Sequence, residues 1–96
     1  MAPVEAEQRI FGNLAEHGLE VVARGGRHFL RYDAGAHQIA WREDEITTQE
    51  LALLQHDRAA EQQVILQLQQ RLQRSGIDPY RQNWTPNSQA PQGEPS

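Results

Sequence analysis

Residues 19–32 read LEVVARGGRHFLRY. Two runs in which apolar and polar residues alternate flank a pair of glycines, and this pattern is typical of a two-residue β-hairpin turn. With Gly25 and Gly26 as the loop, Arg24 faces Arg27 and Val22 faces Phe29. We therefore predict antiparallel strands over 19–24 and 27–32. Their core face carries Leu19, Val21, Ala23, His28, Leu30 and Tyr32.

A third strand is predicted directly after this hairpin, over residues 37–42. Residues 33–36 read DAGA, which is typical of a turn, and a four-residue loop pairs Tyr32 with His37. This register directs Ile39 and Trp41 into the core, whereas a shift by one residue would turn both into water. The three strands then form an antiparallel meander.

A short helix is predicted before the meander, over residues 3–17. Pro3 suits the first turn of a helix, and Gly18 suits the left-handed position that follows the last turn. Leu19 can then fold back on Leu14, a contact that accompanies this type of helix end.

A long helix is predicted after the meander. Thr47 and Glu50 have the spacing of a capping box, and no glycine or proline follows until residue 76. The predicted helix therefore extends to Arg74 and is roughly 40 Å long at 1.5 Å per residue. Because a domain of this size is only about 25–30 Å across, the helix would overhang its own sheet.

The predicted fold class is α+β, with the order α-β-β-β-α: a short N-terminal helix, a three-stranded antiparallel meander and a long second helix packed on one face. Residues 1–77 form the domain, and residues 78–96 form a tail rich in Pro, Gln and Asn that is predicted to be mostly disordered. Within this tail, Tyr80 and Trp84 either attach the chain to the domain or form a short linear motif. Double-stranded RNA-binding domains share the element order, but they carry a basic cluster where residues 43–50 are acidic, so we do not assign that family.

Composition excludes several kinds of site. The chain has no cysteine, which excludes disulfides, thiolate zinc sites and thiol nucleophiles. The four histidines do not converge in the predicted register, and no nucleotide-binding or nucleophile motif occurs. We therefore expect no enzyme, no cofactor and no metal. With neither a signal peptide nor an apolar run long enough to span a bilayer, the expected location is cytoplasmic, without membrane contact.

One candidate partner-binding surface is the outer face of the sheet. It carries Val22, Arg24, Arg27, Phe29, Arg31 and Arg42. Arginines around an aromatic ring can bind single-stranded nucleic acid, and both residue types are also enriched in protein interfaces. The alternative is a solvated face on which Glu20 pairs with Arg31.

A second candidate surface is the apolar stripe at the C-terminal end of the long helix. It carries Val64, Ile65, Leu68 and Leu72, and it is separated from the first half of the helix by Asp57 and Glu61. We expect this end to pack on its own domain, on a second copy of the chain or on another protein.

By elimination, the sequence predicts a non-catalytic protein–protein interaction module: an adaptor, an assembly factor or an inhibitor of a larger protein. A homodimer formed through the long helix is one expected mode. Nucleic-acid binding through the arginine-rich outer face is the alternative. The identity of the protein partner does not follow from the residues.

Overall fold

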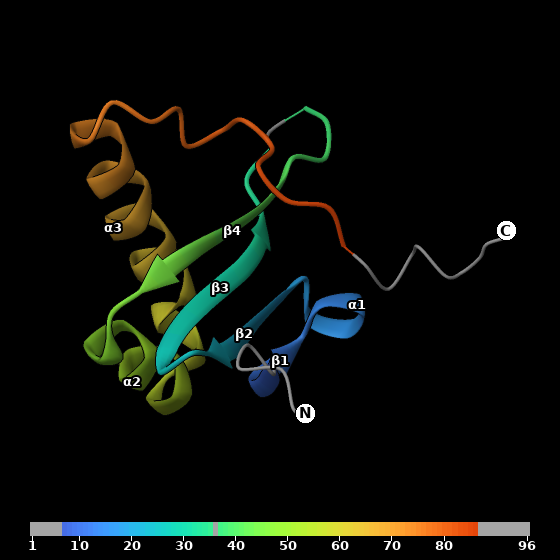
Figure 1. Cartoon of the computed structure of the whole chain (residues 1–96), viewed down its shortest axis with the longest axis vertical. Coiled ribbons are helices and arrows are strands. Elements are labelled where there is room, and N and C mark those ends of the chain that lie inside the picture. The colour runs from blue at the N-terminus through green and yellow to red at the C-terminus, as the bar shows by residue number, and fades with distance from the viewer. Residues whose placement is uncertain (1–6, 36, 87–96) are drawn as a thin grey trace, which may run out of the picture.

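A computed structural model describes residues 7–35 and 37–86. Four antiparallel strands form one sheet in the order β1-β2-β3-β4, and helices cover one face of it (Figure 1). The elements are β1 (Gln8–Asn13), α1 (Leu14–His17), β2 (Leu19–Arg24), β3 (Arg27–Asp33), β4 (Trp41–Ile46), α2 (Thr48–His56), the 3-10 turn η1 (Arg58–Ala60) and α3 (Glu61–Arg74). The predicted α+β class is confirmed, with four strands in place of three.

The central hairpin has the predicted register. Arg24 lies opposite Arg27, Val22 opposite Phe29, and the pairing continues along both strands. Gly25 and Gly26 have φ values of 60° and 78°, which is the left-handed conformation that a tight hairpin turn of this kind requires at both positions. The twist of such a turn matches the twist of the strands on either side.

The prediction of a helix over residues 3–17 is wrong over most of the described residues, and residues 3–6 lie outside them. Residues 8–13 form β1, in which Phe11 pairs with Val21 and a bulge separates Arg9 from Phe11. Gly12 has φ +74°, and a Cβ atom there would lie 2.7 Å from the carbonyl oxygen of Leu19. Pairing with β2 satisfies the backbone groups on one side of this segment, and that tertiary interaction outweighs the helical pattern of its side chains.

The predicted end of the first helix is confirmed, although only the four residues of α1 are helical. Gly18 is left-handed, and its N–H donates to the carbonyl of Leu14 at 3.0 Å. The side chain of Asn13 begins the helix by accepting hydrogen bonds from the N–H groups of Ala15 and Glu16.

The predicted third strand is displaced by four residues. β4 covers 41–46 instead of 37–42, and Tyr32 pairs with Arg42. The carboxylate of Asp33 organises a longer loop by accepting from the N–H groups of Gly35 and Ala40, both at 2.9 Å. As a result Ile39, predicted in the core, is 61% exposed. Ile46 takes the buried position at the far end of the strand instead.

The long helix is broken at Asp57. The capping box of Thr47 and Glu50 is present as predicted, but α2 ends at His56, and Asp57 has an extended backbone with φ −148°. The Asp57 carboxylate accepts from the N–H of Ala59 at 2.9 Å and so begins η1. Aspartate favours such capping positions over helix interiors because its short side chain competes for backbone N–H groups. The break redirects the chain, and α3 packs on the sheet instead of overhanging it.

The core lies between the sheet and the layer formed by α2 and α3 (Figure 1). Its buried apolar side chains are Leu19, Val21, Leu30, Tyr32, Ala34, Ile46, Leu51, Leu54, Val64 and Leu68. Phe11, Ile65 and Leu72 pack at its margin. Neither α2 nor α3 packs on the opposite face of the sheet, and its side chains form the outer face. The short helix α1 lies at one end of that face, where Leu14 and Ala15 line a groove together with Val22 and Arg31.

The ordered chain continues past the predicted domain boundary at residue 77. Residues 78–86 run from the end of α3 along β4 (orange to red in Figure 1), and Pro79 and Pro86 are buried. Asn83 donates its backbone N–H to the carbonyl of Trp41 at 3.1 Å. Residues 87–96, predicted to be disordered, lie outside the described residues.

Candidate functional site

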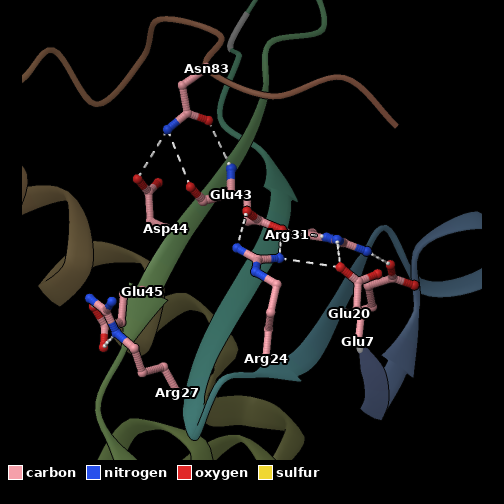
Figure 2. A network of polar contacts seen from close by, with 9 residues as sticks. All are labelled: Glu7, Glu20, Arg24, Arg27, Arg31, Glu43, Asp44, Glu45 and Asn83. Carbon is pink, nitrogen blue, oxygen red and sulfur yellow. Dashed lines mark hydrogen bonds and ion pairs between the residues drawn. The ribbon is translucent and has the colours of Figure 1, made fainter. Parts of the chain in front are cut away.

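The outer face of the sheet carries a network of ion pairs centred on Arg31 (Figure 2). Arg31 lies between Glu20 on β2 and Glu43 on β4, because the register places all three in one cross-strand row. Its Nη1 donates to Glu20 at 3.1 Å and its Nε to Glu43 at 2.9 Å. Its Nη2 donates to Glu7, just before β1, at 2.6 Å. The guanidinium group of Arg31 on β3 therefore connects β2, β4 and the residue just before β1.

Arg24 and Arg27 are paired with carboxylates of the same face. Arg24 donates to both carboxylate oxygens of Glu43 and to Glu7, and its guanidinium lies 4.1 Å from the centroid of the Phe29 ring. Arg27 forms two hydrogen bonds with Glu45, at 2.6 and 3.0 Å. Arg24 thus covers the Phe29 ring. Val22, predicted to belong to the same partner-binding surface, is only 1% exposed and is not available to a partner.

The network shifts the pKa values of its members. Burial alone would lower the pKa of Arg31, but hydrogen bonds to Glu7, Glu43 and Glu20 raise it overall. Burial alone would raise the pKa of Glu43, but hydrogen bonds from Arg24 and Arg31 lower it overall. Each shift favours the charged form, so the network holds its ion pairs at neutral pH.

The outer face is consequently not a basic surface. The three arginines face the carboxylates of Glu7, Glu20, Glu43 and Glu45. Arg9, whose guanidinium lies 4.0 Å from Glu20, makes the set neutral. The pair of Glu20 and Arg31, expected from the sequence under the alternative of a solvated face, is present, and the other carboxylates extend that single pair into a network.

Trp84 covers part of this network. Its ring lies 4.5 Å from the Arg31 guanidinium, a cation–π contact that attaches the segment after α3 to the sheet. Trp84, Arg9 and Glu20 are among the residues that line a groove of about 490 Å³ on this face. Tyr80, the other aromatic residue of the segment, is exposed. Of the two expectations for this pair, attachment holds for Trp84.

Arg42, predicted on the outer face, lies on the core face because β4 has a different register. Its side chain is only 3% exposed and forms two hydrogen bonds of 2.8 Å with Asp44. The Tyr32 hydroxyl donates to the same carboxylate at 2.9 Å. Arg42 also donates to the carbonyl oxygens of Asp78 and Arg81, so this buried ion pair helps to hold the segment after α3 in place.

Residues of that segment, together with Arg71 of α3, cover the edge of β4 that faces away from β3. The Asn83 side chain accepts from the N–H of Glu43 at 2.9 Å and donates to its carbonyl at 3.2 Å (Figure 2). The Gln82 side chain accepts from the N–H of Trp41 at 3.3 Å, and Arg71 donates to the carbonyl of Glu45 at 3.3 Å. An edge strand whose backbone is occupied in this way cannot pair with another chain.

The apolar stripe of the long helix turns toward the sheet. Val64 and Leu68 are completely buried, and Ile65 and Leu72 are partly buried beside them. The structure therefore places this predicted partner-binding surface within the domain, which is the first of the three alternatives expected from the sequence.

The described residues contain no group of three or more His, Asp or Glu side chains that could hold a metal ion. Asp57 and Glu61, the carboxylates that interrupt the helical stripe, occupy the cap of η1 and the first turn of α3. Over residues 7–35 and 37–86, no helix is both long and apolar enough to cross a membrane.

Sequence reasoning did not identify Glu7, Glu43 and Asn83 as members of the outer-face network. Glu43 could have been found from the register, since a strand over 41–46 places it opposite Arg31. The sequence predicts Glu7 in a helix and Asn83 in a disordered tail. The signal in that tail was Trp84, an aromatic residue among polar ones.

In comparisons with known proteins, no family model, no curated protein and no solved structure matches this chain.

Proposed function

We propose that this chain is a non-catalytic protein–protein interaction module that acts as an adaptor, an assembly factor or an inhibitor of a larger protein. The observation that supports this proposal best is the exposed face of α3. Residues 62–70 read QQVILQLQQ and include no charged residue. The exposed side chains of α3 between its charged ends are Gln62, Gln63, Leu66, Gln67, Gln70 and Gln73.

This face has the properties of the centre of an interface. Charged residues are depleted at interface cores because their desolvation is costly, and a neutral helix face avoids that cost. Leu66 is 55% exposed in the middle of the face and offers an apolar anchor. Gln63 and Gln70, one turn away on each side, can donate and accept hydrogen bonds around it.

The inner side of α3 makes the face rigid. Val64 and Leu68 are buried against the sheet, so the helix is fixed before a partner arrives. Arg71 is also bound to Glu50 of α2, at 2.9 and 3.0 Å. A preorganised surface loses less conformational entropy on binding than a flexible one.

The alternative, nucleic-acid binding through the outer face, is less well supported. Arg24 and Arg31 are each bound to two or more carboxylates, and phosphate groups would have to displace those partners. If this alternative held, binding would weaken steeply with salt and would be lost when Arg27 and Arg31 are changed to Glu.

Site-specific photo-crosslinking in the native host tests the proposal. A photoreactive residue at position 66 is expected to give one discrete adduct, and Leu66→Glu is expected to abolish co-purification of the same partner. The matched control is Ile39→Glu, because Ile39 is also an exposed aliphatic residue, at 61%, but lies in the loop between β3 and β4. If position 39 captures the partner as well as position 66, or both substitutions reduce co-purification equally, the α3 face is not the binding surface.

A further inference from the structure

The two edges of the sheet are in different states. The edge of β4 is covered by Asn83, Gln82 and Arg71. On β1, by contrast, no described segment other than β2 donates to or accepts from the backbone of residues 8–12. Gln8, Arg9 and Ile10 are exposed. Among the described residues, β1 is therefore the edge whose backbone is open to another strand.

Two charged residues at this edge lie on the same face of the sheet. Arg9 is opposite Val22, an outer-face residue, and Glu7 contacts Arg24 and Arg31 on that face. Both hydrogen bonds of Glu7 go to its Oε1, so the structure gives Oε2 no hydrogen bond among the described residues. The Glu7 side chain is 39% exposed.

The Arg9 guanidinium can likewise form a further ion pair. Its side chain is 55% exposed, and its carboxylate contact is the 4.0 Å approach to Glu20. Glu7 and Arg9 are two residues apart on one side of the strand, which is the spacing at which neighbouring side chains of a strand share a face.

We propose that β1 is a self-pairing edge, and that two copies of this chain associate by antiparallel pairing of β1 with β1. With the two-fold axis at Gln8, Gln8 of each copy lies opposite Gln8 of the other. Glu7 of each copy then lies opposite Arg9 of the other, which gives two cross-strand ion pairs. The two sheets become one continuous sheet of eight strands, and this contact is isologous, as a two-fold dimer requires. The proposal goes beyond the proposed function, because it concerns a different surface and a different partner.

Charge selects this register over its neighbours. Opposite charges directly across an antiparallel pair contribute about 0.2–1 kcal/mol each, and like charges there are destabilising. An axis at Arg9 would place Arg9 against Arg9, and an axis at Glu7 would place Glu7 against Glu7. Of these three axes, only the axis at Gln8 places Glu7 of each copy opposite Arg9 of the other.

The bulge after Arg9 limits the length of the pairing. Bulges bend an edge strand away from further pairing, so the described part of the contact covers residues 7–9. A contact this short belongs to the small interfaces, which are weak and reversible. The dimer is therefore expected to dissociate on dilution.

Sedimentation velocity over a concentration series is the primary test. The wild-type chain is expected to shift from monomer to dimer as concentration rises, and added salt is expected to weaken the dimer because the ion pairs are exposed. Arg9→Glu places two carboxylates at each pair and is expected to raise the dissociation constant by about tenfold or more. Arg74→Glu, an equal change of charge at an exposed position of α3, should leave the dimer intact.

Cysteine crosslinking tests the register. The chain has no cysteine, so a single Gln8→Cys variant reports this contact alone. Opposed residues of an antiparallel pair lie about 4.5–5.5 Å apart at their Cα atoms, within the range that a disulfide bridges. Gln8→Cys is expected to form a disulfide-linked dimer, whereas Gln63→Cys and Gln73→Cys are not.

Three results would overturn the proposal: a monomer at every concentration, a dimer that Arg9→Glu does not weaken, or crosslinking through Gln63→Cys in preference to Gln8→Cys. A monomer would mean that another segment or another protein occupies the β1 edge. The test is separate from that of the α3 face, because Leu66→Glu should leave self-association unchanged and Arg9→Glu should leave crosslinking from position 66 unchanged.

Discussion

The side chain of Asn83 binds both backbone groups of Glu43. It accepts from the N–H at 2.9 Å and donates to the carbonyl at 3.2 Å, and so takes the place of a neighbouring strand. A second N–H of the same amide group approaches Asp44 at 3.3 Å. One residue thus closes the edge of β4 and connects that edge to the buried ion pair of Asp44 and Arg42.

Asn83→Ala is expected to lower the free energy of unfolding by about 1–2 kcal/mol, because the backbone groups of Glu43 lose their partner. Urea unfolding measures this loss, and hydrogen exchange should show faster exchange of the Glu43 amide. Asn83→Asp should cost at least as much, since a carboxylate cannot donate and would lie beside Asp44. Gln73→Ala, at an exposed position of α3, is the control. If the Glu43 amide exchanges equally fast in wild type and Asn83→Ala, Asn83 does not protect this edge.

Tyr32 is expected to govern stability at alkaline pH. Burial, followed by the negative charge of Asp44, raises the pKa of the Tyr32 hydroxyl far above its ordinary value of 10.0. A group with a raised pKa in the folded state contributes stability below its unfolded pKa, and that contribution is lost as the pH rises beyond it. The chain has no lysine, so few other groups titrate in this range.

The comparison of wild type with Tyr32→Phe isolates this contribution. Wild type should be more stable by about 1 kcal/mol at pH 7, because the hydrogen bond to Asp44 is intact. The difference should shrink above pH 10 and then change sign. Urea unfolding of both proteins from pH 7 to pH 11 measures it, and a difference that stays constant over this range would contradict the assignment.

Glu50 is expected to make the stability of the fold depend on pH in the acidic range. Burial alone would raise the pKa of Glu50, but hydrogen bonds from Arg71 and from the N–H of Thr47 lower it below 4.5 overall. A lowered pKa contributes stability above the unfolded value, and the contribution is lost as the pH falls through the folded value. Glu50→Gln keeps an acceptor for Thr47 but loses the two-pronged contact with Arg71, at a cost of about 2 kcal/mol at pH 7. The difference in free energy of unfolding between wild type and Glu50→Gln, measured by thermal or urea unfolding, should decrease as the pH falls below 4.5. Glu16→Gln, at an exposed position, should not differ from wild type at any pH.

The parts of the fold that the sequence predicts are those determined by local interactions. The hairpin at Gly25 and Gly26 has the predicted register because turn conformation determines the pairing. The capping box of Thr47 and Glu50, and the helix end at Gly18, are likewise determined within a few residues.

Two of the errors, at β1 and at Asn83, concern residues whose partners lie further away along the chain. β1 is a strand because Phe11 meets Val21, and Asn83 is ordered because it meets Glu43. The sequence predicts Arg42 on the outer face because the predicted register pairs Tyr32 with His37. In the structure Tyr32 pairs with Arg42 instead, and Asp44 satisfies the Arg42 side chain in the interior. The register of β4 is displaced because Asp33 organises a longer loop than the sequence predicts, and Glu43 rather than Ile39 then lies in the sheet.

The first strand offers the most direct test of a non-local effect. Gly12 and Gly18 are both left-handed, with φ values of 74° and 79°, but a Cβ atom would lie 2.7 Å from the Leu19 carbonyl oxygen at Gly12 and would contact nothing within 4 Å at Gly18. Gly18→Ala should therefore cost about 1 kcal/mol for its conformation alone. Gly12→Ala should cost about 2–4 kcal/mol, because steric overlap with β2 is added.

Urea unfolding of the two variants, with circular dichroism to confirm that both are folded, separates the two effects. The sign of the result at Gly12 is decisive. If residues 8–13 formed a helix, as their side-chain pattern suggests, alanine would be favoured over glycine by roughly 0.5–1 kcal/mol, and Gly12→Ala would stabilise the protein. A loss at Gly12 that clearly exceeds the loss at Gly18 requires the close pairing of β1 with β2, and this pairing is what places β1 at the edge of the sheet.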